Sequence, residues 1–202
     1  MTANRRRSVL QPGETPRTRG ERTRQRVAEA LIDLVEAGDP APTAKAVAER
    51  ARVSVRLVFH HFEDMDALYG MAAQLQEERN WSELREVPAA LPLEQRVDRT
   101  VQNRTKLFEA IGPLRHALLP VVPRNAVVAS TVAKQEQRLR GGLEATFATE
   151  LRRAGRARRE LLDALDAAAS WEAWDRLRRG QGLGASAARK VMGRTVTSLL
   201  AR

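Results

Sequence analysis

Two adjacent histidines, His60 and His61, are residues whose type and spacing suggest chemistry in a chain that has only three histidines. Imidazole groups bind metal ions and transfer protons near neutral pH. The pair lies between Phe59 and Phe62 in the segment FHHF. In a helix, neighbouring side chains point about 100° apart, so the two rings cannot chelate one ion together. We therefore expect no metal site here.

A second group of candidates consists of polar residues on the apolar sides of predicted helices. Arg104 and Thr105 precede Phe108 on one such side, and Gln135 and Glu136 are placed similarly on another. A charge in this position must be paired or solvated. The interpretation that we favour is a buried pair between Arg104 and Glu136, or a side chain that reaches solvent at the edge of the core. The alternative is a ligand cavity in which Arg104 binds an anionic group or Glu136 a cationic one.

Two tryptophans, Trp171 and Trp174, share one face of a predicted helix. Aromatic pairs of this kind occur in cores, in subunit interfaces and in pockets, and the sequence leaves these three roles open. The candidate pocket residues are therefore Arg104, Thr105, Phe108, Gln135, Glu136, Trp171 and Trp174.

Motifs for catalysis are missing from the sequence. It contains no carboxylate pair, metal-ligand spacing, glycine-rich phosphate loop or nucleophile motif. It contains no cysteine, which excludes disulfides and cysteine zinc sites and fits a reducing compartment. No stretch approaches the roughly 18 apolar residues of a membrane span, and no apolar core follows the N-terminal arginines. We expect a cytoplasmic protein that is not an enzyme, holds no metal or cofactor and does not enter a membrane.

The charge of the chain is strongly basic and unevenly placed. The net charge is +10, and residues 1–26 hold eight arginines and two glutamates, a net +6. A basic segment predicts a polyanionic partner, either nucleic acid or an anionic membrane surface, although a tail that merely increases solubility explains the charge equally well. Residues 1–20 contain almost nothing apolar, so we expect them to form a flexible basic arm.

The elements that must position these residues are predicted to be helices. Apolar residues make up 43% of the chain and aromatic residues only 4%, a composition that favours helices over sheets. We predict an all-α protein. A first helix is expected from residue 21 to Gly38, and the later helices are expected near residues 64–84, 92–112, 114–119, 124–155, 161–177 and 188–199. Gly141 and Gly142 are a predicted kink in the longest of them.

Between the first helix and residue 64, two short helices are predicted to form a helix-turn-helix. Thr43 caps one that ends near Ala51, and Ser54 caps the next, over about residues 55–61. So short a junction makes the helices cross steeply. Val58 and Phe62, four residues apart, are expected in the core. An ordinary α-hairpin in a helical core is the alternative.

The stretch TAKAVAERARVSVRLVFHHFEDMDAL, Thr43 to Leu68, resembles the DNA-binding domain of TetR/AcrR-family transcriptional regulators. The likeness rests on Thr43, Val47-Ala48, Ala51, Val53-Ser54, Phe59, His61-Phe62 and Leu68 in the family's order and spacing, and covers about residues 21–70. It implies a homodimeric repressor, less often an activator. Residues 21–70 would bind a near-palindromic double-stranded operator, and residues 71–202 would bind a small-molecule effector and form the dimer through the last two helices.

The chain departs from the family's usual pattern at four places. Arg52 stands where the family often has glycine, Val55-Arg56-Leu57 replaces a Lys-Gly-Thr-like run, Phe59 replaces tyrosine and Met65 replaces a lysine. If Arg52 needs a positive φ, the arginine costs about 1 kcal/mol there. These changes leave fewer polar side chains to contact DNA bases, so Arg56 becomes the main candidate for such a contact.

From this resemblance and from the geometry of the major groove, we expect DNA contacts from one set of residues. The set is Arg22, Arg24, Thr43, Lys45, Arg52, Ser54, Val55, Arg56, Leu57, Phe59, His60 and His61. Arg56 is the best candidate for a base contact because guanidinium pairs bidentately with guanine, while Val55 or Leu57 suits a thymine methyl. His60 is expected to face the groove, and His61 to pack or to bond near a phosphate. The alternative function is a sequence-neutral basic DNA-binding protein that uses the arm and ignores Arg56.

Overall fold

The computed structural model describes residues 18–81 and 84–201, and within these ranges the chain is helical with no strand. The helices are α1 Arg19–Glu36, α2 Ala44–Ala51, α3 Val55–His61, α4 Met65–Trp81, α5 Leu93–Leu118, α6 Ala126–Thr146, α7 Ala148–Arg153, α8 Arg158–Ala168, α9 Trp171–Asp175 and α10 Ala185–Leu200. Short 3-10 helices at Val122–Arg124 and Gly155–Ala157 and a π-helical turn at Arg176–Gly180 complete the order. The predicted all-α fold is confirmed.

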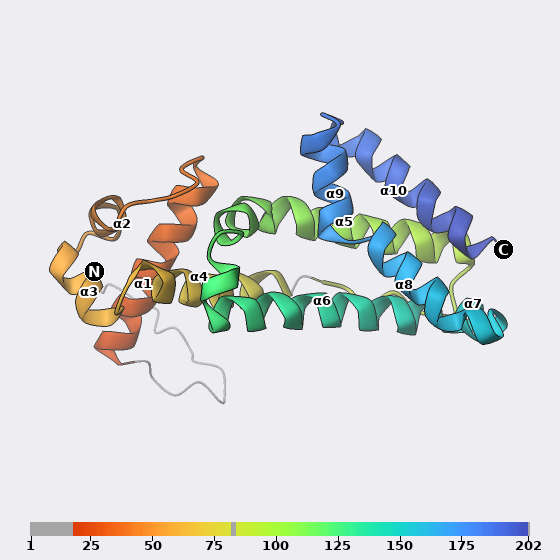
Figure 1. The fold of residues 1–202 in the computed structure, drawn as a ribbon, viewed down its shortest axis with the longest axis horizontal. Coiled ribbons are helices and arrows are strands. Elements are labelled where there is room, and N and C mark those ends of the chain that lie inside the picture. Colours follow the sequence, from red (N-terminus) through yellow and green to blue (C-terminus); the bar gives the residue numbers. More distant parts are fainter. Residues whose placement is uncertain (1–17, 82–83, 202) are drawn as a thin grey trace, which may run out of the picture.

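The molecule is elongated, with α1–α3 at one end and α7 at the other (Figure 1). No helix in the described ranges is long and apolar enough to cross a membrane.

The first helix, α1, begins earlier than predicted. The Thr18 hydroxyl accepts a hydrogen bond from the Glu21 amide at 3.2 Å, and the Glu21 carboxylate accepts one from the Thr18 amide at 2.6 Å. This reciprocal cap satisfies amides that the helix itself leaves without partners. Residues 18–20 therefore belong to the helix start and not to the arm, whose residues 1–17 lie outside the described ranges.

The helix-turn-helix forms as predicted from two side-chain caps. Thr43 accepts a hydrogen bond from the Ala46 amide and Ser54 one from the Leu57 amide, each at 3.2 Å. Between the helices, Arg52 adopts φ 55° and ψ 49°, the left-handed conformation expected where the family often has glycine. The turn is closed by the Val53 amide, which donates to the Ala48 carbonyl at 2.9 Å.

The predicted stop of the fifth helix at Gly112–Pro113 is wrong, because α5 continues through both residues to Leu118. Pro113 lacks the amide that would bond to the carbonyl of Glu109, a loss worth about 3 kcal/mol in a helix interior. Beyond it, Leu114 and Leu118 are buried in the core that holds α1–α4. Their burial outweighs the missing hydrogen bond.

Three other predicted helices also differ in their boundaries. The long helix expected to residue 155 ends at Thr146, where fully buried Phe147 leaves helical geometry before α7. The helix expected to carry both tryptophans is divided into α8 and α9, because the Ser170 hydroxyl accepts a hydrogen bond from the Ala173 amide at 3.1 Å and starts a new helix. The predicted fourth helix ends at Trp81 and not at Leu84.

Side chains form two hydrophobic cores that α5 and α6 connect. The first core joins α1–α4 to the end of α5 and the start of α6, and the second joins the rest of α5 and α6 to α7–α10. Both long helices run along the long axis of the molecule (Figure 1). The two long helices therefore link the second core to the core that contains the helix-turn-helix. The predicted domain boundary at residue 70 lies inside α4 and stays a prediction.

Candidate DNA-binding surface and ligand cavity

Helix α3 presents a mixed apolar and basic face to solvent. Val58 and Phe62 are buried as predicted, at 1% and 2% exposure, and fix the inner side of the helix. On the outer side, Val55 is 38% exposed, Phe59 is 48% exposed, and Arg56 is also exposed. An apolar side chain that remains exposed beside a basic one is poorly explained by packing within this chain, but it suits contact with another molecule.

Other predicted contact residues lie around this face. Thr43, Lys45, Arg52, Ser54 and His60 are exposed, whereas Leu57 and His61 are half-buried. The oxygens of Thr43 and Ser54 accept the capping bonds, but each hydroxyl hydrogen is still available for donation.

The start of α1 packs against the end of α3. The Arg24 guanidinium carbon lies 5.1 Å from the centre of the Phe62 ring, in cation–π geometry. A Cβ added to Gly20 would be 4.0 Å from the His61 ring. Exposed Arg22 and Arg24 are thereby placed on the helix that supports α3.

Positive charge on this surface is largely uncompensated. In the described ranges, Arg22, Arg24, Lys45, Arg52 and Arg56 make no ion pair. The contrast within the same helices is clear, since an exposed arginine at the end of α2 is held 2.8 Å from the carboxylate of a residue in α1. Free arginine and lysine side chains are the groups that bind phosphate oxygens.

The two adjacent histidine rings of α3 contact each other. The His60 and His61 rings meet edge to face with centroids 5.3 Å apart. Among the described residues, no group of three or more histidine, cysteine, aspartate or glutamate side chains could hold a metal ion.

A cavity of about 480 Å³ lies between α5, α6, α8 and α9. Of the predicted pocket residues it brings together Arg104, Phe108, Gln135, Glu136 and Trp171. A volume of this size is within the usual range for small-molecule sites.

Thr105 and Trp174 do not line this cavity. The Thr105 hydroxyl donates to the backbone carbonyl of Gln102 at 3.2 Å. The Trp174 indole donates to Glu109 at 2.9 Å. A hydrogen bond from Arg178 lowers the pKa of Glu109, and the bond from the indole adds to this effect. Both residues thus stabilise the protein around the cavity.

Arg104 does not pair with Glu136, so the predicted structural pair is wrong. The Arg104 guanidinium is buried and donates to the backbone carbonyls of Ala169 at 2.6 Å and Leu139 at 2.5 Å. Burial lowers the pKa of Arg104 to about 10, so the group is still charged at neutral pH. The carbonyl of Ala169, at the end of α8, is a partner that only the tertiary fold could supply.

Glu136 instead pairs with Arg115, at 2.6 Å. Arg115 is buried, with its guanidinium carbon 5.3 Å from the centre of the Trp171 ring. His116 Nε2 donates to the Asp175 carboxylate at 2.8 Å, and the His116 ring meets Trp171 edge to face. The sequence pattern did not place Arg115 and His116 at this site because they lie past Pro113, where the helix was predicted to have ended. Since α5 continues, both residues lie on its apolar side.

Solved structures of known proteins share the fold of this chain, whereas comparisons of sequence give no match. No protein-family model matches the chain, and a search of curated proteins gives no match. A transcriptional regulator from Rhodococcus sp. Rha1 has a TM-score of 0.69 at 21% identity, over 88% of this chain and 96% of that one. A TetR-family transcriptional regulator from Streptomyces coelicolor has a TM-score of 0.63 at 19% identity, over 90% and 89%. The multidrug binding protein EbrR has a TM-score of 0.56 at 17% identity, over 85% and 93%.

Proposed function

Because the chain has the fold of TetR-family transcriptional regulators, we propose that it is a sequence-specific DNA-binding regulator. The observation that carries this proposal is the outer face of α3, where Arg56 makes no ion pair within the described ranges and lies with exposed Val55 and Phe59. A major groove roughly 12 Å wide admits one helix, and the exposed face of α3 suits such a groove.

In the proposed complex, Arg56 reads a guanine through two parallel hydrogen bonds, and Val55 contacts a thymine methyl. Lys45, Arg52 and the Thr43 hydroxyl bind phosphates on either side of the groove and fix the register of α3. Arg22 approaches the same backbone from the start of α1.

We further propose that the protein acts as a homodimer through α8 and α10 and represses transcription until a small effector binds. Val191, 42% exposed between buried residues of α10, supports an interface on this helix. The cavity between α5, α6, α8 and α9 is the proposed effector site, and a multidrug binding protein with the same fold supports a small-molecule role. Two copies of α3 would lie about one DNA turn apart or somewhat more on a near-palindromic operator.

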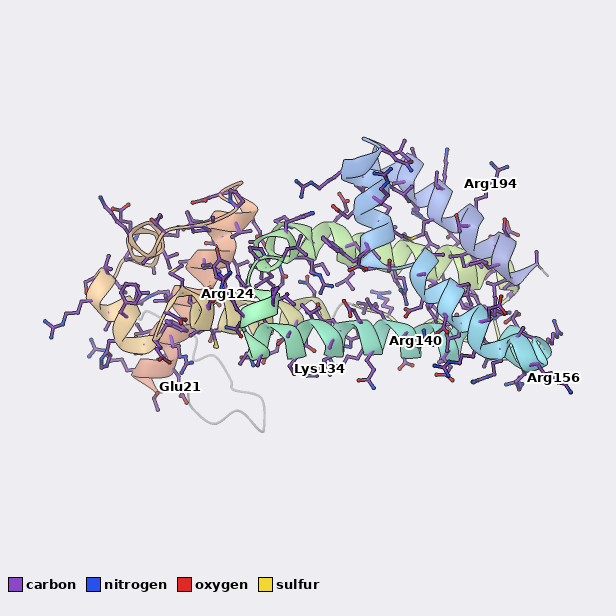
Figure 2. All side chains as sticks on the ribbon, in the orientation of Figure 1. Glu21, Arg124, Lys134, Arg140, Arg156 and Arg194 are labelled. Carbon is purple, nitrogen blue, oxygen red and sulfur yellow. The ribbon has the colours of Figure 1, made fainter. Side chains whose placement is uncertain are left out.

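Fluorescence anisotropy with a selected operator and a random duplex tests DNA specificity. The Arg56→Ala variant should lose most of the preference for the operator, by roughly tenfold or more, and keep its affinity for random duplex. Arg156→Ala is the matched control, since it removes the same charge at the end of the molecule opposite α3 (Figure 2). Equal affinity of the unaltered protein for both duplexes at physiological salt would contradict the proposal.

Deletion of residues 1–17 separates the sequence-neutral alternative from this function. It keeps Thr18, which caps α1. The deletion should weaken binding to all duplexes and flatten the salt dependence, without relaxing sequence preference. If Arg56→Ala behaved in the same way as the deletion, sequence-neutral binding would be favoured.

A further inference from the structure

The cavity between α5, α6, α8 and α9 has Arg104 at its depth, a buried cation that makes no ion pair within the described ranges. Asp166, which also lines the cavity, acts on its charge only from beyond ion-pair distance. Arg104 is 3% exposed, and its two hydrogen bonds in the described ranges go to the neutral carbonyls of Ala169 and Leu139. A guanidinium has five N–H donors, so donor capacity is left over. A buried charge is strongly unfavourable unless an opposite charge pairs with it.

The rim of the same cavity has the opposite imbalance. One guanidinium nitrogen of Arg115 lies 2.6 Å from Glu136 and 3.4 Å from Glu172. Glu136 and Glu172 are largely exposed, with 57% and 62% of their side chains accessible, whereas the Arg115 side chain is 9% accessible. One cation shared between two carboxylates leaves one negative charge in excess.

A second group at the rim also contains two carboxylates, but two arginines face them, because exposed Arg159 lies 4.0 Å from Asp163. Arg140 on α6 lies 2.5 Å from Asp163 and 3.2 Å from Asp166 on α8. Figure 2 labels Arg140 on α6 beside α8. The cavity therefore has buried Arg104 in its interior, and the excess of negative charge at its opening lies with Glu136 and Glu172.

The walls between these two levels are largely apolar. Phe108, Ile111, Leu139 and Trp171 line them. A ligand that fits must therefore carry an apolar body between its polar ends.

We propose that this cavity binds a small zwitterion with an apolar body, whose anionic group bonds to Arg104 and whose cationic group lies at the rim near Glu136 and Glu172. A simple organic anion would satisfy Arg104 but meet the excess negative charge of the rim. A simple organic cation would satisfy the rim and leave Arg104 uncompensated. This proposal deepens the effector role described above and rests on it for biological meaning, while the binding itself does not depend on DNA.

Three probes with the same phenyl-alkyl body test the proposal by isothermal titration calorimetry on the full chain without DNA. They are L-phenylalanine, which is zwitterionic, 3-phenylpropanoate, which is only anionic, and 2-phenylethylamine, which is only cationic. We expect affinity to fall in that order. Strongest binding of the amine, equal binding of all three, or no binding of any of them at millimolar concentration would each overturn the proposal.

Two variants test which residue binds each charged end of the ligand. Arg104→Met keeps the apolar stem and should weaken L-phenylalanine and 3-phenylpropanoate by roughly tenfold or more while sparing the amine. Glu172→Gln, at a largely exposed position, should reduce the preference for L-phenylalanine over 3-phenylpropanoate with little change in folding. If Arg104 only holds backbone carbonyls, Arg104→Met will change the melting temperature and leave the affinity order unchanged, which contradicts the proposal.

The Glu172→Gln variant and the three probes keep the test decisive even if Arg104→Met does not fold. Operator binding of the ligand-free protein is measured separately by anisotropy. Loss of operator binding with the expected probe order would refute the regulator function alone, and normal operator binding with the wrong probe order would refute only the zwitterion site.

Discussion

Replacing Arg52 by glycine should stabilise the protein and weaken DNA binding at the same time. Arg52 holds φ 55° and ψ 49° in the turn between α2 and α3, and its side chain is exposed. A residue with a Cβ pays roughly 1–2 kcal/mol for this left-handed conformation. Glycine avoids that strain but gains roughly 0.4–1 kcal/mol of extra freedom in the unfolded chain.

The balance of these two effects gives Arg52→Gly a net stabilisation of about 0.5–1 kcal/mol. For a chain of this length, the melting temperature should rise by roughly 1–4 °C, measured by circular dichroism. The backbone amide of residue 52, which donates to Glu49 at 3.1 Å, is unaffected. The lost charge should lower DNA affinity and reduce the slope of log affinity against log salt by about one.

Arg52→Ala is the matched control for this experiment. It removes the same charge but keeps the Cβ, so its DNA affinity should match that of Arg52→Gly, without the gain in melting temperature. A melting temperature of Arg52→Gly at or below that of Arg52→Ala would refute the strain argument. Unchanged DNA affinity in both variants would refute the phosphate contact.

Three further predictions concern stability. Arg96→Met should lower the free energy of unfolding by about 3–5 kcal/mol in urea titrations, because it leaves the nearly buried Glu150 carboxylate without its bidentate partner at 2.6 and 2.8 Å. Adding Glu150→Leu should recover most of that loss. A loss below about 1 kcal/mol in the single variant would contradict this prediction. Hydrogen bonds from their arginine partners lower the pKa of Glu150 and Glu109 in the folded state. Their stabilisation is therefore complete above 4.5, the ordinary pKa of a glutamate, and is lost as pH falls through the lower folded pKa. The melting temperature should decrease below about pH 4.5, less steeply in Glu109→Gln, and equal slopes would be evidence against this cause. Ser54→Ala removes the cap of α3 and should lower the free energy of unfolding by about 1 kcal/mol. It should also lower the affinity for the operator. An unchanged urea midpoint would argue against the cap.

Local chemistry made the helix-turn-helix predictable from the sequence. Thr43 and Ser54 each cap a helix through an amide only three residues away, so their effect needs no distant partner. The left-handed conformation of Arg52 was suggested by the resemblance, because the family often has glycine at this position. The exposed residues of α3 could be listed because Val58 and Phe62 fix which side of the helix is buried.

Tertiary contacts explain what the sequence could not predict. Pro113 favours a helix end locally, but burial of Leu114 keeps α5 intact through it. The partners of Arg104 are backbone carbonyls in α6 and at the end of α8, 35 and 65 residues away in sequence. A pair between Arg104 and Glu136 was reasonable by polarity, but the continuing helix brings Arg115 to Glu136 instead.

Selection of bound sequences from a random duplex pool tests the central claim most directly, with the unaltered protein and Arg56→Ala compared side by side. We expect a near-palindromic site with two half-sites about one DNA turn apart or somewhat more, and a guanine in each half-site that Arg56→Ala no longer enriches. Recovery of no common sequence, or of the same sequence with the same guanine in both proteins, would contradict it.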